Sequence, residues 1–162
     1  MKKINWKSLF ISLALSLGTG VLGSLLSGGS MTQYVERYRP PLSPPGWVFP
    51  IVWTILYTLM GIAAYLVWET GTADGKPTEE ASAALTGYLI SLGLNLLWPI
   101  LFFRQEAYLF AFADLILLWI AICRTIRDFR SINETAAKLL APYLVWVTFA
   151  GYLNLAIALH YL

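Results

Sequence analysis

The stretch PPLSPPGWVFPIVWTILY, residues 40–57, joins a loop to an apolar helix. Its four prolines before Gly46 hold the backbone extended, because proline lacks an N–H and cannot propagate a helix. Pro50 lies where a first helical turn tolerates the missing N–H. From Trp47 to Trp68 no residue is charged, and a Trp stands at each end, where its ring prefers the membrane–water boundary. The stretch therefore predicts a transmembrane helix over residues 47–68.

The composition is that of a membrane protein. Of the 162 residues, 58% are hydrophobic and only 12% are charged, whereas a soluble domain carries roughly a quarter charged residues. The basic residues are scattered at helix ends, so no nucleic-acid partner is expected. One cysteine, Cys123, excludes an internal disulfide and a Cys-based metal site.

Four more apolar runs are long enough to span a bilayer. The first could instead be a signal peptide, but its apolar run of about twenty residues exceeds the 7–15 of a signal peptide and matches a roughly 30 Å hydrocarbon core. The sequence therefore predicts an all-α, polytopic membrane protein, residues 1–162 forming a single bundle of five transmembrane helices. The predicted spans are residues 8–28, 47–68, 82–103, 107–123 and 139–159.

The loop charges predict an orientation. Five spans put eight Lys and Arg residues on the side of the N-terminus and three on the other side, which predicts a cytoplasmic N-terminus with the first loop and the C-terminus outside. The three are Arg37, Arg39 and Arg104. No organelle presequence is visible, which favours a bacterial cell membrane.

Asp114 is the one ionisable residue deep in a predicted span, and an acid there needs a partner or a wet cavity. It is either a tie between helices or a ligand contact. Asn95 and Asn154 have the same two interpretations. His160 stands at the far end of the last span, so neither a proton relay nor haem ligation is favoured, and no metal site is expected.

Aromatic side chains that lie too deep to be boundary anchors indicate a pocket. With a few amides and hydroxyls, such a pocket suits a flat, apolar, conjugated ligand that is held by shape and stacking. No set of residues resembles a nucleophile with its base, nor a phosphate loop. The aromatic set is Trp53, Tyr57, Trp98, Trp119, Tyr143 and Trp146.

Several motifs resemble the translocator protein family, also called the tryptophan-rich sensory protein or peripheral-type benzodiazepine receptor family. They fall on four of the five spans and cover nearly the whole chain. The motifs are PPGW (44–47), WTILYTLMG (53–61), LNLLWPILFF (94–103), AFADL (111–115), PYLVW (142–146) and FAGYLN (149–154).

This resemblance implies a five-helix bundle, commonly a homodimer, with a cavity closed by the first loop, residues 30–46. The ligands that it implies are porphyrins such as protoporphyrin IX and haem, sterols, and synthetic isoquinoline carboxamides and benzodiazepines. No cofactor is required. With Trp119 from the aromatic set and two loop residues, the ligand-binding residues expected are Tyr34, Pro45, Trp53, Tyr57, Asn95, Trp98, Asp114, Trp119, Trp146, Ala150 and Leu153.

The resemblance leaves several functions open. The first is a receptor or sensor, and the second is a transporter of porphyrins or sterols, although no inverted repeat is visible. The third is light-dependent oxidative breakdown of protoporphyrin IX, for which Trp53 and Trp146 match residues implicated in some bacterial members. The last is a purely structural subunit.

Two positions depart from the family pattern. Leu42 stands where the first loop usually has a Trp, and Arg39 stands where it usually has a Lys. No basic residue follows Leu153 in the fifth span, so the animal sterol-recognition segment is not expected to work here.

Overall fold

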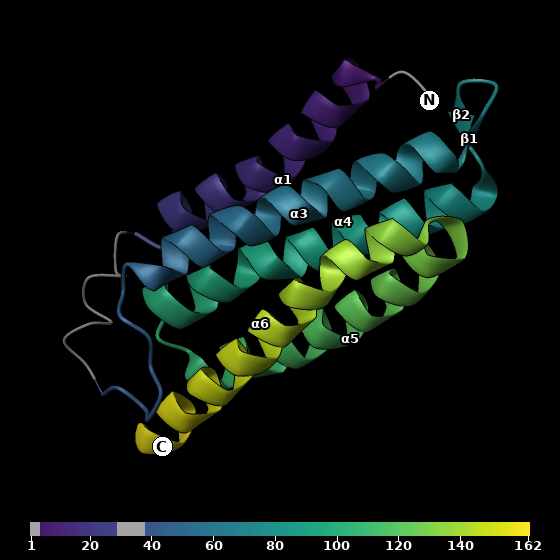
Figure 1. Ribbon diagram of the computed structural model, residues 1–162. Helices are drawn as coiled ribbons and strands as arrows, with labels where there is room; N and C mark the ends of the chain where they lie inside the picture. The colour runs from purple at the N-terminus through teal and green to yellow at the C-terminus, as the bar shows by residue number, and fades with distance from the viewer. Residues whose placement is uncertain (1–3, 29–37) are drawn as a thin grey trace.

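The computed structural model describes residues 4–28 and 38–162 and confirms an all-α bundle (Figure 1). Within these ranges, five helical segments are long and apolar enough to cross a membrane. The protein is therefore an integral, multi-pass membrane protein. The elements are α1 (Trp6–Leu26), α3 (Val48–Thr70), β1 (Thr72–Ala73), β2 (Lys76–Pro77), α4 (Glu79–Pro99), η1 (Ile100–Arg104), α5 (Tyr108–Ile132) and α6 (Glu134–His160).

The helices are packed so that α1 lies along one edge of the bundle and α5 along another (Figure 1). Helix α1 contacts α3 and α4, whereas α5 packs mainly on α4 and α6. The core between α3, α4, α5 and α6 includes Met60, Tyr88, Phe129 and Tyr143, all at most 1% exposed. Helix α1 is the least buried of the five apolar helices in the described part of the chain, with 11% of its most apolar stretch buried.

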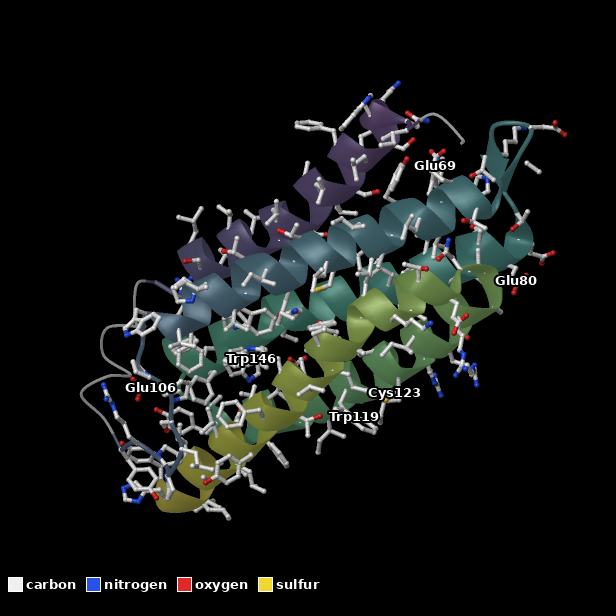
Figure 2. The ribbon with its side chains drawn as sticks, viewed as in Figure 1. Glu69, Glu80, Glu106, Trp119, Cys123 and Trp146 are labelled. Carbon is white, nitrogen blue, oxygen red and sulfur yellow. The ribbon has the colours of Figure 1, made fainter. Side chains whose placement is uncertain are left out.

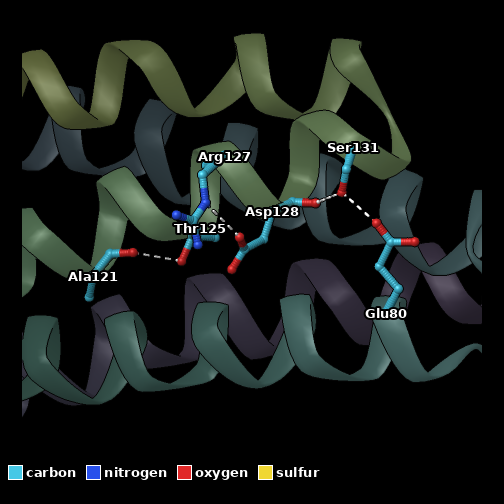
Figure 3. Close-up of polar contacts among 6 residues, drawn as sticks. All are labelled: Glu80, Ala121, Thr125, Arg127, Asp128 and Ser131. Atoms are coloured by element: carbon cyan, nitrogen blue, oxygen red, sulfur yellow. Dashed lines mark hydrogen bonds and ion pairs between the residues drawn. The ribbon is translucent and has the colours of Figure 1, made fainter.

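Helix α5 ends at Ile132, well beyond the predicted span of 107–123, and α6 begins at Glu134. The polar residues of this extension can remain helical because they lie at a charged end of the bundle and bond to neighbouring elements. The Ser131 hydroxyl donates to Glu80 of α4 at 2.6 Å and to the Asp128 carbonyl at 2.8 Å (Figure 3). Asn133 then caps α6, its side chain accepting from the Ala136 N–H at 3.0 Å.

A short hairpin joins α3 to α4, where the sequence predicts an exposed linker with turn residues. Strands β1 and β2 pair antiparallel, with Ala73 opposite Lys76. The two residues between them, Asp74 and Gly75, have φ of 51° and 76°. Two positive φ angles define the hairpin turn whose twist matches the strands, and Asp-Gly is a preferred pair for it.

Candidate functional site

A cavity of about 490 Å³ lies between α1, α3 and α4, at the end of the bundle where α1 finishes and α3 begins. Its volume is within the range of sites that hold drug-sized ligands. The walls are mainly aromatic and aliphatic, with one amide and several hydroxyls. The lining residues are Leu17, Gly20, Val21, Gly23, Ser24, Ser27, Phe49, Pro50, Trp53, Thr54, Tyr57, Asn95, Trp98, Pro99 and Phe103.

The α4 wall of the cavity is shaped by Pro99. Proline has no N–H to donate to the carbonyl one turn earlier, so the regular α-helical ladder is interrupted there. The following residues, 100–104, form the wider π-helical turn η1, in which the Gln105 N–H donates to the Ile100 carbonyl at 3.0 Å. The Trp98-Pro99 pair predicts a kink in the last turns of the helix, and the structure has the wider turn η1 at that place. Trp98 and Phe103, on either side of the break, both line the cavity.

The floor of the cavity depends on the close approach of α1 to Tyr57 of α3. A Cβ atom at Gly20 would lie 2.5 Å from Cε2 of the Tyr57 ring, so only glycine fits there. Gly20, Ser24 and Gly28 recur every four residues, a spacing that predicts a small face that another helix can approach closely. At Gly20 that face receives an aromatic ring of the same chain.

A chain of hydrogen bonds crosses the bundle behind the cavity wall. The Tyr57 hydroxyl donates to Asn95 Oδ1 at 3.2 Å, and Asn95 Nδ2 donates to the Tyr143 hydroxyl at 2.8 Å. All three side chains are at least nine-tenths buried. Asn95 is thus a tie between helices that also lines the cavity, and its contact with a ligand stays a prediction.

The second amide, Asn154, joins three helical segments. It accepts from Trp98 Nε1 at 3.0 Å and donates to the Tyr108 carbonyl at 2.8 Å. It also lines a small cavity of about 20 Å³, together with Ala150 and Leu153. Phe49, Trp98 and Phe103 line both cavities, so the small cavity lies next to the large one.

Trp146 lies one ring away from the main cavity. Its ring meets Phe49, a lining residue, edge to face at a centroid distance of 5.9 Å. Its indole N–H is buried and has no hydrogen-bond partner among the described residues. A buried N–H without a partner is costly, and such groups call for an explanation such as an acceptor supplied by a ligand.

Asp114 is 5% exposed, and neither of its carboxylate oxygens has a hydrogen-bond partner in the described part of the chain. It lines neither cavity. Within residues 4–28 and 38–162, no three His, Cys, Asp or Glu side chains are grouped so that they could hold a metal ion. One interpretation of Asp114 was a tie between helices. Within the described residues, its carboxylate makes no direct hydrogen bond that would form such a tie.

Trp119 does not belong to the cavity, contrary to the expectation from the aromatic set. Its side chain is 42% exposed, and its N–H donates to the Thr148 hydroxyl at 2.9 Å. In Figure 2 it lies at the α5 edge of the bundle, close to Cys123, whereas Trp146 lies nearer the middle. Trp119 lies on the outward-facing side of α5, and its residue type alone does not determine on which side of the helix it lies.

The first loop contributes no lining residue from its described part, residues 38–46. Tyr34 lies outside the described residues, and Pro45 lines neither cavity. The loop is held to the end of α6, where the Tyr152 hydroxyl donates to the Pro41 carbonyl at 3.1 Å. Tyr38 stacks on His160 with ring centroids 3.8 Å apart. Leu42, where the family usually has a Trp, is 82% exposed.

The residues that sequence reasoning missed belong mostly to α1. Leu17, Val21 and Ser27 are small or aliphatic, so nothing in their chemistry separates a cavity wall from a lipid-facing surface. The spacing of Gly20 and Ser24 was the one available signal on this helix. Phe49 and Phe103 were the missed aromatic residues. Phe49 stands four residues before Trp53 and so shares its helical face.

Comparisons with known proteins agree with this architecture. A family model described as the TspO/MBR family matches residues 10–160. The tryptophan-rich protein TspO of Chlorobaculum tepidum is 37% identical over 151 residues, which cover 93% of each chain. The human translocator protein is 37% identical over 88% of this chain and 83% of its own. A tryptophan-rich sensory protein of Cereibacter sphaeroides is 32% identical over 93% of this chain and 89% of its own.

Proposed function

Because the chain belongs to the TspO/MBR family, we propose that it is a membrane receptor or carrier that binds porphyrins and related hydrophobic ligands in the cavity between α1, α3 and α4. The observation that carries the proposal is the position of Trp53, Tyr57, Asn95 and Trp98. These residues form two pairs, one on α3 and one on α4, and all four line one cavity of about 490 Å³.

The chemistry of the walls favours a flat conjugated ligand such as protoporphyrin IX. Trp53 and Trp98 offer ring faces for stacking, and such pairs contribute about 0.5–1.5 kcal/mol beyond burial. The lining, as far as it is described, contains no histidine, cysteine or methionine. Tyr57 is the one described lining side chain of a type that can ligate haem iron, and its hydroxyl donates to Asn95. Haem would therefore be held mainly as protoporphyrin is, by shape and stacking.

The unpaired indole N–H of Trp146 supplies the specific polar contact that the proposal needs. A porphyrin carboxylate, or the carbonyl of a carboxamide, is an acceptor for it. Phe49 is the ring between Trp146 and the cavity, so the bond requires Phe49 to turn aside when the ligand enters. The small cavity at Ala150 and Leu153, about 20 Å³, has room for a substituent of the ligand about the size of a water molecule.

Photo-oxidative breakdown of protoporphyrin IX is the second candidate, because Trp53 is on the cavity wall and a photoexcited porphyrin, or the oxidant that it forms from oxygen, can oxidise an adjacent indole. In this structure Trp146 is one ring farther away. Loss of Trp53 should therefore slow porphyrin consumption more than loss of Trp146. Transport of porphyrins or sterols and a homodimer are compatible with the fold and remain proposals, as do the bacterial cell membrane and the cytoplasmic N-terminus.

The test is a titration of the purified protein in detergent with protoporphyrin IX, followed by tryptophan fluorescence and then repeated under light. Saturable quenching with a stable porphyrin spectrum supports a receptor or carrier. Saturable quenching followed by porphyrin loss, abolished in Trp53→Phe, supports the photo-oxidative enzyme. Quenching that does not saturate would overturn the porphyrin proposal and leave sterols or a structural role.

A further inference from the structure

Helices α1 and α3 come into close backbone contact at Gly61 of α3. A Cβ atom at Gly61 would lie 3.0 Å from the Leu13 Cα atom, so α3 touches the backbone of α1 there. Toward the end of α1 the contact partner changes. The Cβ position at Gly23 is 3.4 Å from Pro99 of α4, so α1 leans on α4 at this level. The cavity occupies the space that this leaves between α1 and the first turns of α3.

The wall of the cavity is open between these two helices. Four lining residues are also exposed at the molecular surface: Val21 and Ser24 of α1, and Pro50 and Thr54 of α3. The lining residues on α4 are buried or half-buried. The cavity therefore reaches the surface at one side, through a gap framed by Val21, Ser24, Pro50 and Thr54, which is called the lateral port below.

The surface around the lateral port is apolar. Leu22 and Leu25 of α1, and Ile51 and Ile55 of α3, flank it and are each more than half exposed. Neither helix carries a charged residue at the level of the port. Both helices are long and apolar enough to span the membrane. In a bilayer the port therefore opens to hydrocarbon, because such residues face lipid tails and not water.

We propose that the cavity exchanges its ligand with the bilayer through the lateral port, and so takes molecules that dissolve in lipid before they are bound. The inference rests on the proposed function for the identity of the ligand, but the port can be tested without a porphyrin. The described part of the first loop supports this route, because residues 38–46 contribute no lining residue and Pro41 is bonded to Tyr152 of α6, not to α1.

The experiment uses a thiol at the cavity wall as the target. Ser27 is 3% exposed and lines the cavity, so Ser27→Cys in a Cys123→Ser background places one thiol inside. The protein is reconstituted in phosphatidylcholine vesicles with pyrene maleimide dissolved in the lipid, and the rate of labelling is measured. Thr54→Trp then fills the port. The matched control is Leu117→Trp, which adds the same ring to a lipid-facing position, 57% exposed, on α5, a helix that does not line the cavity.

If the port exists, Thr54→Trp should slow labelling at least about tenfold, which corresponds to about 1.4 kcal/mol of added barrier. Leu117→Trp should leave the rate unchanged. Val21→Trp, on the opposite rim, should slow labelling in the same way and replaces Thr54→Trp if that variant does not fold. Equal rates in the plugged and control proteins would overturn the port, as would faster labelling by a charged, water-soluble thiol reagent than by the lipid-dissolved one. Absence of labelling by either reagent would also count against it.

Protoporphyrin IX titrations on the same proteins separate this inference from the proposed function. If Thr54→Trp slows labelling but the protein shows no saturable porphyrin binding, the lateral port is supported and the porphyrin proposal is overturned. If porphyrin binding is saturable but Thr54→Trp does not change the labelling rate, the receptor proposal is supported and the lateral port is overturned.

Discussion

Replacing Gly20 by alanine should push Tyr57 out of its place and damage the cavity floor. The added Cβ would lie 2.5 and 2.7 Å from two atoms of the Tyr57 ring, well inside van der Waals contact. The ring cannot yield freely, because it is stacked near Trp53 with centroids 5.5 Å apart and its hydroxyl is bonded to Asn95. Overpacking of this kind costs about 1–3 kcal/mol.

The matched control is Gly18→Ala, two residues earlier on α1, where a Cβ meets nothing within 4 Å. Both changes gain the same helix propensity, about 1 kcal/mol, so the difference between the variants isolates the clash with Tyr57. We expect Gly20→Ala to be less stable than Gly18→Ala by about 1–3 kcal/mol. At about 2–4 °C per kcal/mol for a chain of this size, thermal unfolding in detergent resolves the difference.

Ligand binding should follow the same order, because Tyr57 lines the cavity. Gly20→Ala is expected to weaken protoporphyrin binding, and Gly18→Ala to leave it unchanged. Equal unfolding temperatures together with equal porphyrin binding for the two variants would refute the packing of Gly20 on Tyr57. Equal stability with unequal binding would show that the ring moves without cost.

Three further substitutions separate structural from ligand-contacting residues. Asn95→Leu leaves the buried hydroxyls of Tyr57 and Tyr143 without their partner, which should lower the free energy of unfolding by about 1–3 kcal/mol for each hydroxyl. The loss is measured as a fall in unfolding temperature. An unchanged temperature would contradict the hydrogen-bond chain. Asp114→Asn should keep porphyrin binding and change the free energy of unfolding by less than about 1 kcal/mol. No described hydrogen-bond partner is lost, and an amide costs less to bury than a charge. Loss of binding with an intact fold would make Asp114 a ligand contact. In fluorescence titrations Trp53→Phe should remove much of the porphyrin quenching and Trp119→Phe little, and the reverse order would place the ligand at the outer face of α5.

The residues that sequence reasoning placed correctly at the cavity are those whose chemistry is unusual in a membrane span. Trp53, Tyr57, Asn95 and Trp98 carry N–H, O–H or amide groups that lipid cannot satisfy, so their burial at a shared site follows from their residue types. Trp119 carries the same group, yet its N–H is satisfied by Thr148 at the outer surface. The packing of the helices determines on which face of a helix an indole lies. The residue type alone does not determine it.

The extent of the helices was harder to infer than their existence. Arg124, Arg127 and Arg130 mark where the apolar run of α5 stops, and the predicted span stops there as well. The helix continues through them because water satisfies the charged side chains while the backbone bonds persist, up to Ile132. The wall contributed by α1 was missed for a related reason, since aliphatic residues serve equally well against lipid or ligand.

The most direct test of ligand binding in this cavity is to map the oxidation that bound protoporphyrin IX leaves on the protein. The complex is illuminated briefly with one equivalent of porphyrin, digested, and searched by mass spectrometry for oxidised tryptophan and tyrosine. We expect modification to concentrate on Trp53, Trp98 and Tyr57, which line the cavity. Modification concentrated on Trp6, Trp47 or Trp119, which are 71%, 67% and 42% exposed, would contradict a ligand bound between α1, α3 and α4.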